Sequence, residues 1–246
     1  FGQQRAWVFE CLTARGYWPL VAGLFDARLL ETPVMLRATT EALRTLAGGE
    51  DFGALLAFTL RISPDHRGSL AAVLGHIARR ADNAGEILRS CDQELRAAEP
   101  ATAAVMLQLY AVVQTPEAAT ALSSWLRHEA KAVRTAAVQA LGRWESGGSV
   151  EVLLEAAETH PDRELRSAAL RAVAAVLRRR NAFRDQAPVL AWLRRALTAA
   201  ESADDKKALL ATVAQYRGAT ARKLVEQYFD DPKLGAEAKN VAERMR

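Results

Sequence analysis

Apolar residues recur along this chain at helical spacing, and one such pattern occurs twice. Residues 132–141 and 164–173 match position by position at a distance of 32 residues, with Arg134 and Arg166 at the same place. Each copy reads apolar, Arg, small, Ala, Ala, apolar, any residue, Ala, apolar. Apolar positions three and four residues apart form one stripe along a helix. Both stretches are therefore predicted to be helices with one buried face.

A shorter helix is predicted between the two copies, over residues 149–157. It begins after Gly147 and Gly148 and ends before Pro161, so that one repeat consists of two antiparallel helices. A helix pair of this size cannot bury both of its apolar faces alone and must stack on copies of itself. The equivalent position of the second helix can be followed along the chain at Leu36, Arg67, Thr102, Arg134, Arg166, Lys206 and Leu234.

This alignment predicts seven helix pairs and one capping helix at 3–15. The first helices of the pairs are expected at 20–31, 52–62, 84–97, 117–127, 149–158, 188–200 and 219–230. The second helices are expected at 33–47, 65–80, 100–113, 131–144, 163–179, 204–216 and 234–245. No run shows sustained strand alternation, so we expect an all-α fold, a right-handed α-α superhelix (solenoid) whose second helices line the concave face.

Proline and glycine fall where these helices should begin and end. Proline is tolerated at the first position of a helix, and this is the place predicted for Pro33, Pro64, Pro100, Pro116 and Pro161. The preceding hydroxyl residues are predicted N-caps at Thr32, Ser63 and Thr115. No linker or low-complexity segment interrupts the pattern, so residues 1–246 are expected to form a single solenoid. Because the chain begins with Phe1, we expect it to be part of, or cut from, a longer chain.

The paired phrases at 132–141 and 164–173 resemble the second helix of bacterial HEAT-like repeats, whose signature is an apolar-Arg-x-x-Ala core. Residues 140–144, 206–210, 230–232 and 237–238 are also similar to HEAT arrays of large bacterial proteins. The resemblance is specific over about 115–246 and rests on periodicity alone over 1–114. It implies a HEAT-repeat (ARM-type) fold and a protein-interaction platform, and such a fold does not determine the partner.

Composition and cysteine content narrow the class of protein. The apolar runs are far too short to cross a membrane, so no transmembrane segment is expected. Cys11 and Cys91 offer neither a disulfide framework nor metal-ligand spacing, and both are interpreted as buried apolar side chains. The sequence does not determine the cellular compartment of the protein, although a cytoplasmic location is slightly favoured.

Positive charge is concentrated in one part of the chain. The formal net charge is +4, yet residues 161–200 alone carry nine arginines against three acidic residues. The candidate binding site for an acidic partner consists of the arginines that do not recur in the repeat, namely Arg178, Arg179, Arg180, Arg184, Arg194 and Arg195. Arg134 and Arg166 could form a basic ladder for a ligand, but their recurrence favours contacts to the adjacent repeat.

An enzymatic alternative comes from the HEAT-fold alkylpurine DNA glycosylases, which combine an Asp with aromatic and Arg residues in a concave groove. In this chain Trp125, Trp144 and Trp192 lie near predicted helix ends without an Asp at helical spacing, where they are expected to fill gaps between repeats. The runner-up function is therefore a nucleic-acid-binding protein, possibly glycosylase-like, that uses the basic region 163–195.

Sequence motifs for catalysis or cofactors are absent. The four histidines, His66, His76, His128 and His160, lack the i, i+4 arrangement of a zinc hydrolase, and no P-loop, dinucleotide fingerprint or nucleophile elbow occurs. We therefore expect no enzyme, no cofactor, no metal and no small-molecule substrate. The favoured function is a noncatalytic scaffold that binds a protein partner through its concave face, with nucleic acid as the less favoured partner.

Overall fold

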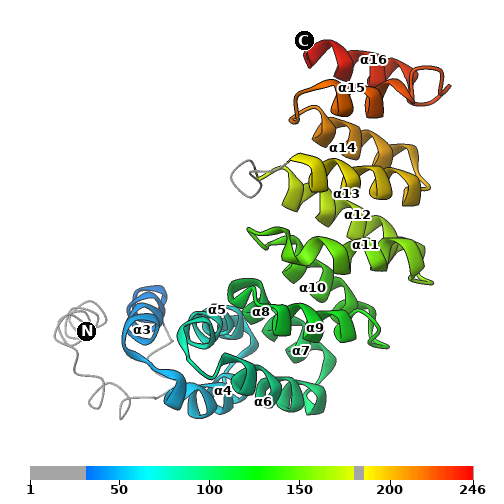
Figure 1. Ribbon diagram of the computed structural model, residues 1–246. Coiled ribbons are helices and arrows are strands. Elements are labelled where there is room, and N and C mark those ends of the chain that lie inside the picture. Colours follow the sequence, from blue (N-terminus) through cyan, green and yellow to red (C-terminus); the bar gives the residue numbers. More distant parts are fainter. Residues whose placement is uncertain (1–31, 180–185, 246) are drawn as a thin grey trace. The chain divides into compact units, whose positions relative to one another are not determined.

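A computed structural model describes residues 32–179 and 186–245. The chain divides into two compact units, residues 1–113 and 114–246 (Figure 1). Throughout the described residues the regular structure is helical and no strand occurs, as the periodicity predicted. The expected capping helix at 3–15 and the first helix at 20–31 lie outside the described residues, as does Cys11. The single solenoid over 1–246 stays a prediction.

The first unit contains three consecutive second helices and the first helices between them. Its helices are α3 (Pro33–Leu46), η2 (Gly49–Asp51), α4 (Phe52–Arg61), α5 (Pro64–Arg80), α6 (Ala84–Ala97), α7 (Pro100–Met106) and α8 (Gln108–Val113). The long helix α5 is central, since it packs against α3 on one side and against α7 and α8 on the other. α4 and α6 contact each other and cover α5 as a second layer.

The second unit repeats the same two-layer arrangement four times. Its helices are α9 (Pro116–Trp125), α10 (Lys131–Gly142), η3 (Gly147–Ser149), α11 (Val150–Thr159), α12 (Arg163–Leu177), α13 (Gln186–Ala199), α14 (Ala203–Val213), α15 (Ala219–Glu226) and α16 (Gly235–Arg244). The second helices α10, α12, α14 and α16 pack in succession, and the first helices α11, α13 and α15 do the same. The pairs follow one another in chain order from green to red in Figure 1.

Helix starts follow the predicted capping in most places. Thr32 and Thr115 accept hydrogen bonds from the amides three residues on, at 3.2 and 3.3 Å. Two expectations were wrong. Ser63 makes no side-chain cap to α5. Pro161 lies in the turn before α12, because Asp162 is the residue that caps this helix, accepting from the amides of Glu164 and Leu165.

One predicted second helix is divided. Residues 100–113 form α7 and α8 with Leu107 in a turn between them, although no glycine or proline marks the break. α8 lies directly on α5 at Gly75, where an added Cβ would stand 2.6 Å from the carbonyl oxygen of Leu109. The close approach of two backbones therefore requires glycine at this position.

The core consists of the stripes that the periodicity predicted. Trp125 and Trp144 are completely or almost completely buried at helix ends and fill space between helices, as expected. Trp192 differs, since it is partly exposed and its indole N–H donates to Glu151 at 2.6 Å. Cys91 is fully buried, as predicted, and burial raises the pKa of its thiol to about 12. Of the helices in the described ranges, none combines the length and apolarity that crossing a membrane would require.

Candidate functional site

Arg134 ties its own repeat to the next one. Its guanidinium donates to the carbonyl oxygens of His128 at 3.0 Å and Glu129 at 2.6 Å, in the turn before α10. The same guanidinium forms an ion pair with Asp162 at 2.9 Å, at the start of α12. Hydrogen bonding to Arg134, together with the amide of Leu165, lowers the pKa of Asp162. With these partners, the side chain of Arg134 serves to hold neighbouring repeats together.

Arg166 makes the corresponding contacts one repeat later. It donates to the carbonyl oxygens of His160 at 2.8 Å and Pro161 at 3.2 Å, and it pairs with Glu201 at 2.6 Å. In the first unit Arg67 donates to the carbonyl oxygens of Leu60 and Ile62, at the end of α4, and to the Thr102 hydroxyl at 2.6 Å. The predicted contacts to adjacent repeats are confirmed, and we call these three residues the arginine joints.

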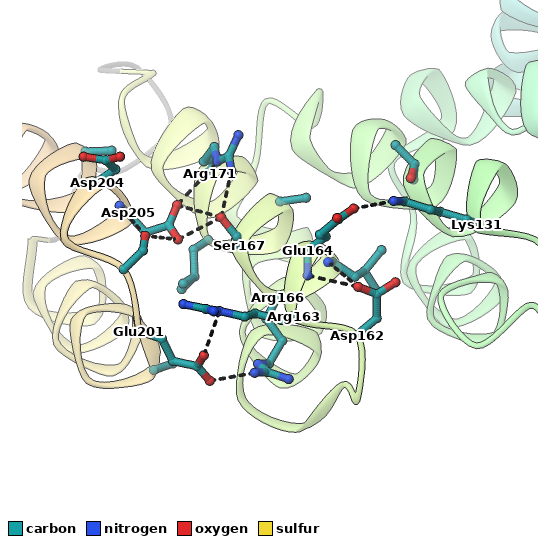
Figure 2. A pocket seen from close by; sticks show the side chains of 17 residues that line it. Lys131, Asp162, Arg163, Glu164, Arg166, Ser167, Arg171, Glu201, Asp204 and Asp205 are labelled. Carbon is teal, nitrogen blue, oxygen red and sulfur yellow. Dashed lines mark hydrogen bonds and ion pairs between the residues drawn. The ribbon is translucent and has the colours of Figure 1, made fainter.

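A groove of about 1100 Å³ runs along the second helices α10, α12 and α14. We call it the second-helix groove; Figure 2 shows its lining side chains. Its charged members are four basic and five acidic residues, namely Lys131, Arg163, Arg166, Arg171, Asp162, Glu164, Glu201, Asp204 and Asp205.

Most of these charges are paired from one helix to the next. Lys131 on α10 pairs with Glu164 on α12, and Arg163 and Arg166 both reach Glu201 in the turn before α14 (Figure 2). Asp204 is exposed, and no ion pair is formed by its carboxylate within the described ranges. The groove is therefore a polar surface with a formal charge of about −1, in which the side chains hold one another in place.

Asp205 is the buried acid of the groove, with only 5% of its surface exposed. Its carboxylate accepts from Ser167 at 2.8 Å and from Ser202 at 2.6 Å, and it lies 3.4 Å from Arg171. Ser202 also accepts from the amide of Asp205 and so caps α14. These bonds join α12 to α14 and satisfy a carboxylate whose burial would otherwise be costly.

The described members of the predicted arginine cluster differ in their contacts, and binding of an acidic partner by the cluster stays a prediction. Arg179 donates to the carbonyl oxygens of Gly142, at 2.9 Å, and Trp144, so it caps the end of α10. Arg178 is exposed at the end of α12. Arg180 and Arg184 lie outside the described residues.

Arg194 and Arg195 lie in the middle of α13, eight and nine residues after its start, or about 12 Å along the helix axis. Arg195 forms a bidentate pair with Glu158 at 3.0 Å and a further pair with Glu151 at 2.7 Å. Hydrogen bonds to Glu158 and Glu151 raise the pKa of Arg195. Arg194 is exposed and lines a second, smaller hollow of about 430 Å³.

Sequence reasoning missed the carboxylates that complete these contacts. Glu201, Asp205 and Glu158 lie 35, 38 and 37 residues from the arginine or serine that each one binds. One local signal existed, because Ser202 and Asp205 have the spacing of a capping box at the start of a helix. Within the described ranges, no group of His, Cys, Asp or Glu residues is arranged to hold a metal ion.

One comparison with known proteins agrees with this architecture over part of the chain. Residues 84–174 match the family of HEAT repeats. No curated protein matches the sequence.

Three solved structures show limited similarity to this chain. Two engineered proteins of the Northeast Structural Genomics Consortium are 18% and 19% identical, with TM-scores of 0.40 and 0.42. The first alignment covers 79% of this chain and 94% of the other, and the second covers 89% and 67%. A designed armadillo repeat protein is 16% identical with a TM-score of 0.37, covering 89% of this chain and 98% of the other. Residues 84–174 thus match the HEAT-repeat family, and the described residues form an all-α fold of repeated helix pairs.

Proposed function

We propose that this chain is a noncatalytic scaffold that binds a segment of a partner protein in the second-helix groove. The observation that carries the proposal is the groove itself, about 1100 Å³ in volume and built from side chains of three successive repeats. Small-molecule pockets measure roughly 300–1,000 Å³, so the groove has room for a peptide segment. The proposal treats residues 1–246 as one scaffold.

Preorganisation supports binding at this surface. The pairs Lys131–Glu164, Arg166–Glu201 and Ser167–Asp205 join neighbouring helices and fix the lining side chains before any partner arrives. A surface that is already ordered loses little conformational entropy on binding, which leaves more of the contact energy for affinity.

Charge favours a protein over a nucleic acid as the occupant. Binding of a polyanion depends on cations that are free to replace counterions at several phosphates. In the groove Arg163, Arg166 and Arg171 are each paired with a carboxylate, and the lining carries one more acidic than basic residue. Trp125 and Trp144 are buried, so neither can stack on a base.

A peptide library displayed against the chain tests the proposal. Ala168 lies in the groove wall, so Ala168→Trp should fill the groove, while Thr120→Trp on the exposed face of α9 is the matched control. Selected peptides should bind the Ala168 variant at least about tenfold more weakly, a change of about 1.4 kcal/mol, and should bind the control as they bind the original chain. Both variants are first compared with the original chain by circular dichroism.

Two results would count against the scaffold. Peptides that bind both tryptophan variants equally would place the binding surface elsewhere. The nucleic-acid alternative predicts duplex DNA binding at low salt that weakens steeply as salt rises. If Arg163→Gln and Arg171→Gln reduce that binding and its salt slope, the alternative replaces the present proposal.

A further inference from the structure

The hollow of about 430 Å³ beside α13 is distinct from the second-helix groove. It is bounded by the end of α11, the first turns of α12, the middle of α13 and the turn that follows α13. It shares Arg166, Ala199 and Glu201 with the groove, so these three residues lie between the two. Three arginines and two glutamates line the hollow, which leaves one positive charge in excess.

Two of the three arginines already have partners in the chain. Arg195 is held by both carboxylate oxygens of Glu158 at 3.0 Å. Arg166 is held by Glu201 and by two turn carbonyls. Each of the two glutamates is therefore neutralised by an arginine, and the remaining charge belongs to Arg194.

Arg194 is exposed, and no group within the described ranges accepts a hydrogen bond from its side chain. A guanidinium offers five N–H donors in a planar fork that matches the two oxygens of a carboxylate. Thr198, one turn further on, donates its hydroxyl proton to the carbonyl oxygen of Arg194 at 3.0 Å. Ala157 and Ala199 are small side chains in the wall and leave room for methylene groups.

We propose that this hollow binds an aspartate or glutamate side chain of a partner protein, with its carboxylate on Arg194 and its methylene groups against Ala157 and Ala199. One carboxylate balances the single excess charge. A phosphate group carries about −1.5 to −2 charges at neutral pH, more than the single excess positive charge of the hollow. A nucleic-acid strand would add further phosphates to the same surface, so a protein side chain fits best.

Fluorescence anisotropy with short labelled peptides tests this site at low ionic strength. The probe is a glycine-serine peptide with two glutamates, and its glutamine and lysine counterparts are the peptide controls. The glutamate peptide should bind and the other two should not. Arg194→Gln should weaken binding about three- to fivefold, the range of one partly exposed ion pair.

Two further variants separate a shaped site from general attraction. Thr198→Trp leaves every charge in place but fills the hollow, and it should weaken binding at least as much as Arg194→Gln. Arg143→Gln removes an exposed arginine at the end of α10 that does not line the hollow, and it should leave binding unchanged. Circular dichroism should show the same helix content and melting temperature in all three variants, because the altered side chains are exposed.

The proposal is overturned if the glutamate peptide does not bind, or if Arg194→Gln and Arg143→Gln weaken its binding equally. Unchanged binding to Thr198→Trp would also overturn it, because the hollow would then play no part. A phosphoserine peptide or a single-stranded oligonucleotide that binds more tightly, with the same dependence on Arg194, would identify a phosphate site instead.

Discussion

Arg163 and Arg166 share one carboxylate, and this allows an arginine joint to be tested against a surface ion pair. Both guanidiniums reach Glu201, at 3.3 and 2.6 Å. Arg163 is 72% exposed and has no other partner within the described ranges, whereas Arg166 is 21% exposed and also binds the carbonyls of His160 and Pro161. We compare Arg163→Met with Arg166→Met, which remove the same charge from adjacent turns of α12.

The two substitutions should lower the free energy of unfolding by different amounts, because only Arg166 has hydrogen-bond partners besides Glu201. An exposed ion pair contributes about 0–1 kcal/mol, which is the expected effect of Arg163→Met. Hydrogen bonds to charged groups contribute about 1.5–3 kcal/mol when the groups are buried. Arg166 makes three such bonds, but Glu201 is half exposed and water can replace part of what is lost, so Arg166→Met should cost about 2–3 kcal/mol in free energy of unfolding.

Urea unfolding, monitored by hydrogen exchange, measures the difference in stability between the two variants at α12 and α14. With a slope of about 1–3 kcal/mol per molar urea, Arg166→Met should lower the midpoint for α12 and α14 by roughly 1 M. Arg163→Met should lower it by less than half of that. Equal shifts in the two variants would show that the turn carbonyls add nothing and that the joint is an ordinary surface pair.

Three other perturbations address the packing and the charges of the array. Gly75→Ala should destabilise the first unit by about 1–3 kcal/mol, because the added Cβ would stand 2.6 Å from a backbone oxygen of α8. Gly68→Ala in the same helix meets only a side chain at 3.9 Å and should leave the thermal midpoint unchanged or raise it; similar losses in both variants would refute the close contact. Ala169→Asp places a charge at a fully buried position and should cost on the order of 3 kcal/mol or more in urea unfolding, whereas full stability would mean that the helix register is wrong. Arg134→Met should raise the pKa of Asp162 toward its ordinary value of about 3.9, as measured by carbon NMR of the carboxyl group. Because the folded pKa is depressed, Asp162 stabilises the fold above that ordinary value and loses this contribution as pH falls through the folded pKa; an unchanged titration in the variant would contradict the assignment.

Sequence periodicity predicted most described helices to within a few residues because each repeat buries its own stripe of apolar side chains. The break at Leu107 could not be predicted in this way. Residues on both sides of it continue the apolar spacing, and no breaking residue marks it. α8 lies against α5 at Gly75, more than 30 residues earlier, so the shape of this segment is associated with a long-range contact.

The same limit applies to the charged residues. The repeated position of Arg134 and Arg166 was enough to predict contacts between repeats. The hydrogen-bond partners of Arg179 and Arg195 could not be predicted, because they lie 35 or more residues earlier in the chain and follow no simple spacing. The sequence also did not distinguish Arg194, which has no ion-pair partner within the described ranges, from its paired neighbour Arg195.

The arginine joints also affect how the number of repeats in such a chain can increase. Arg134 and Arg166 stand 32 residues apart, and each binds the turn before its own helix and an acid of the following repeat. A tandem duplication of residues 134–165 would place the new arginine after His160 and Pro161 and supply it with a new Asp162. Every joint would then be complete without a single substitution. Internal duplication could thus lengthen the array and its binding surface by one repeat in a single genetic event.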